Sequence, residues 1–339
     1  MTNQRALRVV AAGVLLVTAA CSGSTGPTSD GATPSAATIA EGFVVLVDGL
    51  DRPTQIAEGP EGSLLVAQLA GDEADAVGQV LAVDVASGAK RVLLEGLDKP
   101  TGVLWESGAL WVMVRNGLIR SEWPGGPEPA GPIEVVLDGL ASNGRSEGTL
   151  TGLRDGRFLY ETSGSLIGQT IASGSGTLWV FDPGDRTSQP VATGLKNAYA
   201  HAVLGDGRIV TTDIGDNIDD APVEELNVVT LGQTIDLGWP ACPGDQTCQG
   251  VPDPVAIFPR SSTPTGVAVV GTTAYVTLFV TGQLMRIALT EVGDRLAGGT
   301  PEEVLDGLAG PHTVLARLDG TLWISEHLAN RIIVVEPDR

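Results

Sequence analysis

Histidine, cysteine and basic residues are scarce in this sequence. Its 339 residues include three histidines, three cysteines and 20 Lys and Arg residues, against 41 Asp and Glu residues, which gives a formal net charge of −21. A chain this acidic repels phosphate backbones, so nucleic acid is excluded as a partner and binding to anionic lipid headgroups is disfavoured. Cys242 and Cys248 lie close together, but no histidine lies within forty residues of them. A zinc site built on this pair is therefore disfavoured, because zinc needs further ligands nearby.

Long apolar runs are also missing. The apolar run near the start, Val9–Ala20, has 12 residues, and a helix of that length is too short to cross a bilayer. Arg5 and Arg8 precede this run, and the combination is typical of a secretory signal peptide. No later segment is long and apolar enough to span a membrane.

The end of the apolar run, residues 17–21 (VTAAC), resembles the bacterial lipobox, in which the cysteine is acylated after cleavage. We predict a signal peptide over residues 1–20 and an extracytoplasmic lipoprotein of the cell envelope, which contacts the membrane only through the lipid on Cys21. The alternative is an ordinary secretory signal in which Cys21 has no special part. Residues 21–40 are rich in Ser, Thr, Gly, Pro and Ala and predict a flexible linker, which leaves residues 41–339 as the folded domain.

The remaining cysteines, Cys242 and Cys248, are separated by five residues in a segment that reads as a loop. In an oxidising compartment outside the cytoplasm, such a pair is most simply a disulfide that closes the loop. The alternative is two free thiols.

A repeat with a spacing of mostly 43 to 55 residues runs through the domain. Each unit contains short runs of Val, Leu, Ile and Trp separated by glycine turns, and no stretch has the 3.6-residue periodicity of a long amphipathic helix. Four short strands per unit are typical of a propeller blade, so the six units predict an all-β, six-bladed β-propeller. Five units begin with a Gly-Leu pair, at residues 49–50, 96–97, 139–140, 194–195 and 307–308, and a sixth copy without this pair spans residues 262–279.

The two ends of the domain complete one blade. The last unit stops after three strands, at Ile332–Pro337, while the first apolar segment, Phe43–Leu50, has no unit before it. We predict that this N-terminal strand pairs with the final blade and closes the ring.

In a propeller, the first strand of each blade lines the central channel, and a ligand binds where the loops leading into these strands converge. His201 and His312 fall at such positions and are the candidate catalytic bases, because a neutral imidazole accepts a proton near neutral pH. Gln55 and Arg145 also lie at lead-in positions and are candidates for contacting a cofactor or a small-molecule ligand. His327 follows a second strand, so we expect it at the surface.

An acidic segment, Asp213–Asp245, interrupts the repeat after the second strand of the fourth unit. Calcium favours clustered carboxylate and carbonyl oxygens, so the segment is a candidate calcium site, although its spacing is not that of an EF-hand loop. The alternative is a solvated acidic loop that leaves the blade and returns for its third strand.

Three separated motifs resemble the glucose/sorbosone dehydrogenases, soluble quinoproteins that use pyrroloquinoline quinone (PQQ). They are the segments DIGDN (213–217), EELN (224–227) and TIDLGWP (234–240), and further similar pieces are GLKN (194–197) and STPTG (262–266). The resemblance implies oxidation of a sugar hydroxyl, with hydride transfer to PQQ and calcium polarising the quinone. It places Lys196 and Asn197 at the cofactor, and it places Glu224 and Glu225 at a calcium site near the acidic segment, for which Asp213 is a further predicted ligand.

The sequence departs from the family pattern at this site. The catalytic histidine of the family enters on the third blade, where this chain has Gly139–Glu147 and no histidine. Arg145 cannot replace it as a base, since a guanidinium stays protonated. Ala198 stands where the family has proline, and Ile214 where it often has glutamine. Two alternatives to a sugar dehydrogenase therefore stay open: a propeller that binds a ligand or protein without redox chemistry, and a calcium-dependent lactonase, to which residues 58–60 (EGP) have a superficial likeness.

Overall fold

The structure, a computed structural model, describes residues 42–70, 77–144, 147–215, 223–293 and 295–337. The predicted signal peptide, Cys21, the linker and Arg145 lie outside the described residues. Apart from one turn of 3-10 helix at Pro60–Gly62, the regular elements described are strands, β1 to β28. No helix in these ranges has the length and hydropathy that a membrane span requires.

Three blades come from the first half of the chain. Their strands, in order of pairing within each sheet, are as follows. Blade 1 contains β2 (Pro53–Glu58), β3 (Leu64–Gln68), β4 (Val77–Val83) and β5 (Lys90–Asp98); blade 2 contains β6 (Gly102–Glu106), β7 (Ala109–Val114), β8 (Gly117–Glu122) and β9 (Glu134–Leu137); blade 3 contains β10 (Thr151–Gly152), β11 (Phe158–Thr162), β14 (Thr177–Asp182) and β15 (Thr187–Thr193). A separate hairpin, β12 (Leu166–Ile167) and β13 (Thr170–Ile171), follows the second strand of blade 3.

The other three blades follow the same plan with added strands. Blade 4 contains β16 (His201–Val203), β17 (Ile209–Ile214), β18 (Glu224–Val229) and β20 (Ala256–Phe258); blade 5 contains β21 (Pro264–Val270), β22 (Thr273–Leu278), β23 (Gln283–Val292) and β25 (Glu302–Leu305); blade 6 contains β26 (Pro311–Ala316), β27 (Leu322–Glu326), β28 (Arg331–Val335) and β1 (Phe43–Val47). Outside this plan, β19 (Ile235–Asp236) pairs in parallel with β15, and β24 (Arg295–Gly298) pairs with the far end of β23.

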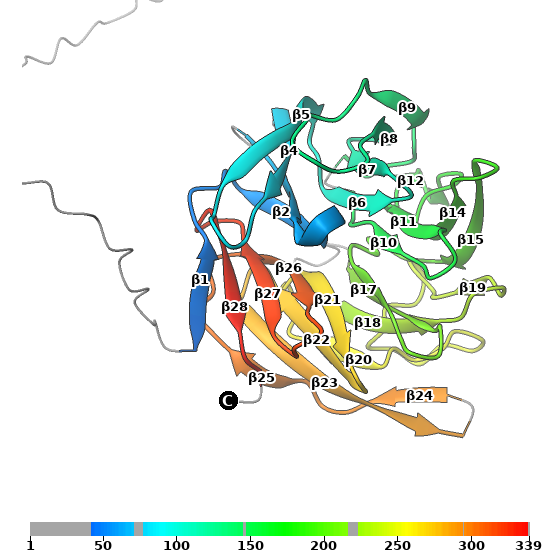
Figure 1. The fold of residues 1–339 in the computed structure, drawn as a ribbon. Helices are drawn as coiled ribbons and strands as arrows, with labels where there is room; N and C mark the ends of the chain where they lie inside the picture. The colour runs from blue at the N-terminus through cyan, green and yellow to red at the C-terminus, as the bar shows by residue number, and fades with distance from the viewer. Residues whose placement is uncertain (1–41, 71–76, 145–146, 216–222, 294, 338–339) are drawn as a thin grey trace, which may run out of the picture. The chain divides into compact units, whose positions relative to one another are not determined.

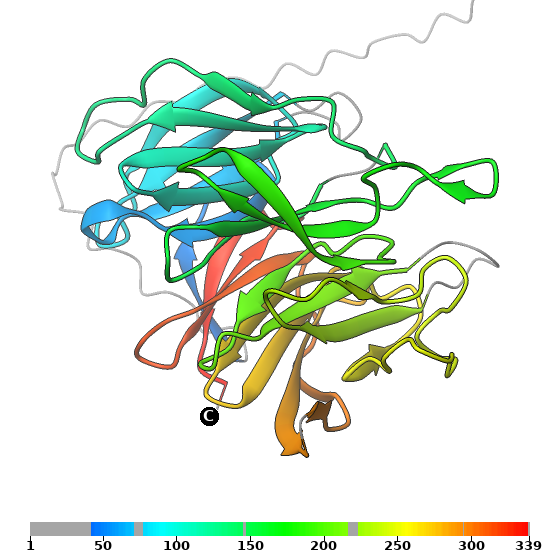
Figure 2. The ribbon, with the colours of Figure 1, turned by 90° about the vertical axis from the view of Figure 1, so that its right-hand side faces the viewer.

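The six blades close into a ring (Figure 1). The first strands contact one another in the cyclic order β2, β6, β10, β16, β21, β26 and back to β2. The N-terminal strand β1 pairs antiparallel with β28, with Phe43 opposite Val335, and both views place these two strands side by side (Figures 1 and 2). The prediction of a six-bladed propeller closed by the N-terminal strand is confirmed, although the strand ends at Val47 because Gly49 adopts a positive φ of 65°.

The hydrophobic core lies between neighbouring blades, which explains why their strands are apolar on both faces. In β7 the first five residues are buried without alternation. Trp111 on this strand packs against Phe158 and Phe181 of blade 3, with ring centroids 5.1 and 5.6 Å away. Because both faces of an inner strand are covered by adjacent blades, the period-2 pattern of a half-exposed sheet is weak here.

The acidic segment does not form one continuous loop. Glu224–Val229 is the third strand of blade 4, paired with β17 so that Glu225 lies opposite Asp213. The expectation that the whole segment leaves blade 4 before its third strand is therefore wrong for this part. The longer excursion lies between β18 and β20, where β19 docks on the outer edge of blade 3.

One polar device recurs at the end of the second strands. Gln68, Asp213 and Glu326 each lie four residues after the start of the second strand of their blade. Each side chain accepts a backbone N–H from the loop that leads into the same blade: from Asp51, from Lys196 and Asn197, and from Ala309, respectively. The device anchors the lead-in loops, which are the segments that surround the mouth of the channel.

Candidate functional site

A cavity of about 250 Å³ lies where the lead-in loops of blades 1, 4, 5 and 6 converge. It is smaller than the roughly 300–1,000 Å³ of pockets for drug-sized ligands, so it suits a small molecule. We refer to it as the mouth cavity. Its described lining has hydroxyl, amide, imidazole and apolar groups and contains no Lys, Arg, Asp or Glu.

Two positions of the repeat supply most of the lining. Thr54, Thr265 and His312 are the second residues of the first strands of blades 1, 5 and 6. Tyr199 takes the corresponding place in blade 4, two residues before β16. Leu69, Ile214 and His327 follow the anchoring residues of the second strands in blades 1, 4 and 6, and Phe279 follows the corresponding residue of blade 5, Leu278. Asn197, Thr263 and Val280 complete the wall. Radial symmetry therefore brings eight side chains that are distant in sequence to one place.

His312 lies in the wall of the mouth cavity and is buried, with 7% of its surface exposed. Its Nε2 is 3.1 Å from the hydroxyl oxygen of Tyr199, while its Nδ1 is buried and has no hydrogen-bond partner among the described residues. Burial, reinforced by the neighbouring His327, holds the pKa of His312 well below its usual range. The imidazole is thus neutral at pH 7 and has an unused polar nitrogen.

His327, expected at the surface, is buried in the same cavity, with 8% exposed. Its ring stacks on that of His312, with centroids 5.5 Å apart, and its Nδ1 lies 3.2 Å from the carbonyl oxygen of Pro53 in blade 1. Sequence reasoning missed this residue because it lies outside the lead-in loops. The available signal was its place in the repeat, directly after Glu326, which matches the place of Ile214 after Asp213.

His201 does not share a position with His312. In blade 4, His201 pairs with Thr211 of the second strand. Ile324 is the residue of blade 6 that corresponds to Thr211, and it pairs with Val314, which lies two residues after His312. Tyr199 is the residue of blade 4 that corresponds to His312. The expectation of two histidines at equivalent positions is therefore wrong, and His201 is absent from the lining of the mouth cavity.

His201 is buried, with 3% exposed, and its Nδ1 lies 2.8 Å from the Thr151 hydroxyl. Burial lowers its pKa to about 3. Because His201 binds a proton more readily in the unfolded state, the contribution of its neutral, buried ring to the free energy of unfolding is present above a pH of about 6.5 and is lost as the pH falls towards 3. We expect the free energy of unfolding of wild type to fall by roughly 1.4 kcal/mol per pH unit in this window relative to that of His201→Asn, measured by urea unfolding between pH 7 and pH 4. If the free energies of unfolding of the two proteins changed equally with pH, His201 would not be the buried neutral group described.

Lys196 and Asn197, the predicted cofactor pair, point to different sites. Asn197 lines the mouth cavity, and its buried Oδ1 has no hydrogen-bond partner among the described residues. Lys196 lies in a neighbouring pocket of about 330 Å³, where its Nζ donates to the Gly164 carbonyl at 2.8 Å and lies 5.2 Å from the ring centroid of Trp239. The backbone amides of both residues donate to Asp213, which fixes this divergence.

Gln55 is fully engaged with the backbone of two other blades. Its Oε1 accepts the amides of Val103 at 2.7 Å and Leu150 at 2.9 Å, and its Nε2 donates to the Leu150 carbonyl at 2.7 Å. The side chain is 8% exposed and is absent from the lining of the mouth cavity. Its contacts are those of a clamp between blades 1, 2 and 3.

The three predicted calcium ligands do not converge on one point. Asp213 and Glu225 lie opposite each other in the β17–β18 pair, while Glu224 is the next residue along β18 and therefore faces the other side of the sheet. Burial raises the pKa of all three carboxyls, that of Glu224 to about 7. No group of three or more His, Cys, Asp and Glu side chains that could hold a metal ion occurs among the described residues. Calcium binding stays a prediction.

Two buried acids occupy the part of blade 3 where the family resemblance places a catalytic histidine. Glu147 is fully buried, and Glu161 accepts the amide of Gly148 at 3.0 Å. Burial, followed by the charge of Glu147, holds the pKa of Glu161 well above its usual range. These carboxyls are suited to staying protonated in the interior rather than to accepting a proton from a substrate.

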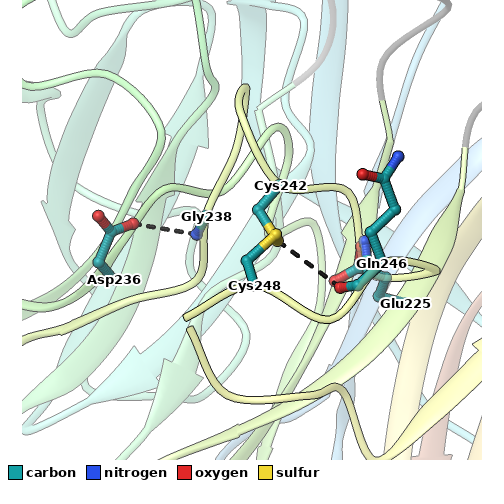
Figure 3. Close-up of a disulfide and its surroundings, with 7 residues drawn as sticks. Glu225, Asp236, Gly238, Cys242, Gln246 and Cys248 are labelled. Atoms are coloured by element: carbon teal, nitrogen blue, oxygen red, sulfur yellow. Dashed lines mark hydrogen bonds between the residues drawn. A yellow bond between two sulfur atoms is a disulfide. The ribbon is translucent and has the colours of Figure 1, made fainter. Parts of the chain in front are cut away.

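Cys242 and Cys248 form a disulfide (Figure 3). It closes a small loop in the excursion between β18 and β20, where the amide of Gly244 donates to Glu225 at 2.6 Å and that of Gly238 donates to Asp236 at 3.0 Å. Cys242 also lines the pocket that contains Lys196. The disulfide therefore shapes the pocket beside the mouth cavity.

The turn EGP has no metal-binding features. Glu58 is exposed at the end of β2 and forms an ion pair with Arg317 of blade 6, and Pro60 starts the 3-10 turn. The likeness to the lactonases at this place is one of turn chemistry.

The arrangement of strands is that of a six-bladed β-propeller, and comparison with known proteins places it more closely. No protein-family profile and no curated protein sequence matches the chain. Among solved structures, the PQQ-bound aldose sugar dehydrogenase from Streptomyces coelicolor matches with a TM-score of 0.73 and 21% identity, over 90% of this chain and 99% of that one.

Two fungal enzymes are similar as well. An AA12-family carbohydrate-active enzyme from Trichoderma reesei matches in its iodide structure with a TM-score of 0.73 and 17% identity, over 90% of this chain and 99% of that one. The PQQ domain of a pyranose dehydrogenase from Coprinopsis cinerea matches with a TM-score of 0.68 and 14% identity, over 89% of this chain and 97% of that one. The chain thus has the fold of the PQQ-dependent sugar dehydrogenases.

The described residues of the mouth cavity do not fit PQQ. This cofactor is a tricarboxylate, and holding it requires cationic side chains or several aimed hydrogen-bond donors. The described lining has no Lys or Arg, and the candidate Lys196 faces the neighbouring pocket. We therefore assign no reaction step to PQQ at this cavity.

Proposed function

We propose that this propeller binds a small, uncharged, hydroxyl-rich molecule of the sugar class in the mouth cavity. The observation that carries the proposal is the pair of buried polar atoms, His312 Nδ1 and Asn197 Oδ1, that line the cavity without a hydrogen-bond partner among the described residues. A buried polar atom without a partner costs roughly 1–3 kcal/mol, which a ligand hydroxyl would recover. Charged ligands are disfavoured because the described lining carries no charge to pair with them.

The remaining lining suits such a ligand. The hydroxyls of Thr263 and Thr265 and the phenol of Tyr199 can each donate and accept hydrogen bonds. Phe279 and Leu69 offer apolar surface to the C–H face of a sugar ring. His312, held neutral by burial, is the group that can accept a hydroxyl proton.

Oxidation of the bound sugar with PQQ is the second candidate. It is supported by the fold shared with the PQQ-bound Streptomyces coelicolor enzyme, and it is opposed by the lack of cationic side chains in the described lining. The two candidates differ in a simple test, because binding requires neither PQQ nor calcium.

We expect one or more neutral aldoses to raise the melting temperature of the full-length chain in the presence of EDTA, because a ligand that binds only the folded state stabilises it. Replacing His312 by Asn or Asn197 by Ala removes one hydrogen bond and should weaken binding roughly tenfold. His201→Asn is the matched control, since it changes a buried histidine outside the cavity and should retain the shift.

A panel of neutral aldoses without any shift in wild type would refute the binding proposal. Reduction of an artificial electron acceptor that requires both aldose and added PQQ with calcium would instead establish the second candidate.

A further inference from the structure

We propose that the mouth cavity selects a sugar that carries an apolar substituent, such as an alkyl glycoside, and that Val280 and Leu328 hold this substituent. We refer to these two side chains as the apolar rim. The inference rests on the proposed function, because it adds a second contact region to a ligand whose hydroxyl part occupies the cavity.

Both residues of the apolar rim are large and exposed. Val280 and Leu328 each have 64% of their surface exposed, and Val280 also belongs to the lining of the mouth cavity. Apolar side chains that are scattered singly over a surface are ordinary, whereas those grouped at the edge of a pocket indicate that a ligand covers them. The position of the two side chains relative to each other and to the cavity therefore decides between these cases.

The two residues occupy the same place in neighbouring blades. The amide of Val280 donates to the Ser262 carbonyl in blade 5 at 3.0 Å, and that of Leu328 donates to the Ala309 carbonyl in blade 6 at 3.1 Å. In both blades the preceding residue lines the mouth cavity. Because blades 5 and 6 are adjacent in the ring, the two side chains belong to one side of the mouth.

Contacts around Gly310 place Leu328 beside the cavity. A β-carbon added at Gly310 would lie 2.8 Å from Cγ of Leu328 and 3.1 Å from Cε2 of Phe279. Leu328 and the cavity residue Phe279 thus approach the same point, and Val280 directly follows Phe279 in the chain. The missing side chain at Gly310 keeps the apolar rim continuous with the aromatic part of the cavity wall.

The other blades that line the cavity have small residues at this place. Leu69 and Ile214 correspond to Phe279, and they are followed by Ala70 in blade 1 and by Gly215 in blade 4. The apolar rim is therefore confined to the side formed by blades 5 and 6. A ligand whose hydroxyls occupy the cavity would direct an apolar group over this side.

The chemistry of the surroundings favours an uncharged aliphatic group. The described lining of the cavity has no charged side chain, so an ionised substituent would lack a counter-charge there. Two aliphatic side chains can cover a short alkyl chain by the hydrophobic effect. They are too few for a stable protein interface, which takes about 800 Å² from each partner.

The test compares the methyl and hexyl glycosides of glucose, galactose and mannose by calorimetric titration of the full-length chain in EDTA, below the concentrations at which micelles form. Each fully buried methylene raises affinity about fourfold. A hexyl chain that is half covered should therefore bind at least about tenfold more tightly than methyl for one or more of these sugars. This ratio is measured on wild type and does not depend on any variant.

Replacement of the apolar rim locates the gain. Val280→Ser and Leu328→Ser should each lower the hexyl-to-methyl affinity ratio at least about threefold, because each removes part of the surface that covers the chain. Leu318→Ser is the matched control, since Leu318 is fully exposed in the turn between β26 and β27 and should leave the ratio unchanged.

The outcomes separate this inference from the proposed function. Equal affinity for methyl and hexyl glycosides in wild type, or an unchanged ratio in both rim variants, would overturn the apolar rim while leaving hydroxyl binding in the cavity intact. No binding of any free aldose or glycoside would overturn both proposals.

Discussion

Replacing Gln55 by Leu is expected to lower the free energy of unfolding by roughly 3–9 kcal/mol, since it leaves three backbone groups without partners and each costs about 1–3 kcal/mol when buried. These groups are the amides of Val103 and Leu150 and the carbonyl of Leu150. They belong to blades 2 and 3, while Gln55 belongs to blade 1, so the loss would fall on the contact between blades. Urea unfolding at pH 7, followed by tryptophan fluorescence, measures the difference.

Gln189→Leu is the matched control, because it makes the same chemical change at an exposed strand position. We expect its effect to lie within about 0.5 kcal/mol of zero. If Gln55→Leu were equally mild, the clamp would not be a stabilising element of the ring, and Gln55 would be open again to a role in ligand contact.

The second large effect concerns the glycine of the Gly-Leu pairs. Gly139 and Gly194 occupy the same place in the repeat, with positive φ values of 65° and 69°. A β-carbon at Gly139 would meet no atom within 4 Å, whereas one at Gly194 would overlap the Asp236 carboxylate and lie 2.6 Å from the Gly238 nitrogen. Gly139→Ala should therefore cost only the backbone strain of about 1–2 kcal/mol, and Gly194→Ala should cost roughly 2–4 kcal/mol more.

The additional loss at Gly194 has a structural reason. The segment around β19 docks on blade 3 through Leu237 N–H to Thr193 and Trp239 N–H to Gly194, and an added methyl would displace it. Chemical unfolding of the two alanine variants side by side measures the difference directly. Equal losses would mean that the docking contributes nothing to stability.

The architecture was predictable because its signals repeat. Glycine turns, short apolar strands and Gly-Leu pairs recur often enough to predict six blades. An unmatched strand at the start of the domain and a unit of only three strands at its end predict closure. The pairing of Phe43 with Val335 is the direct result. A repeat can be recognised even when one copy is irregular, because every blade contains the same pattern.

The site was less predictable because it depends on single-residue register. His201 lies six residues after Leu195, whereas His312 lies four residues after Leu308, so the two histidines occupy different places in the repeat. The strand pairing agrees: His201 pairs with Thr211, while Val314, and not His312, pairs with the corresponding residue Ile324. Lys196 and Asn197 are adjacent, yet their side chains enter different pockets because successive residues in extended chain face opposite sides.

Charge density was a weak guide for a related reason. Asp213 has the sequence context of a metal ligand, but its place in the repeat is that of Gln68 and Glu326, which anchor their lead-in loops. Glu224 and Glu225 lie within a strand and therefore diverge. Comparing equivalent positions across blades would have found both this anchoring role and the place of His327 in the mouth cavity.

The most direct test of the mouth cavity as a ligand site is the ¹⁵N spectrum of the imidazoles, because the chain contains only three histidines. In histidine-labelled protein, a saturating neutral aldose should shift the Nδ1 resonance of His312 and leave that of His201 in place. Unchanged resonances for His312 under conditions where the sugar stabilises the protein would contradict the account and place the ligand elsewhere.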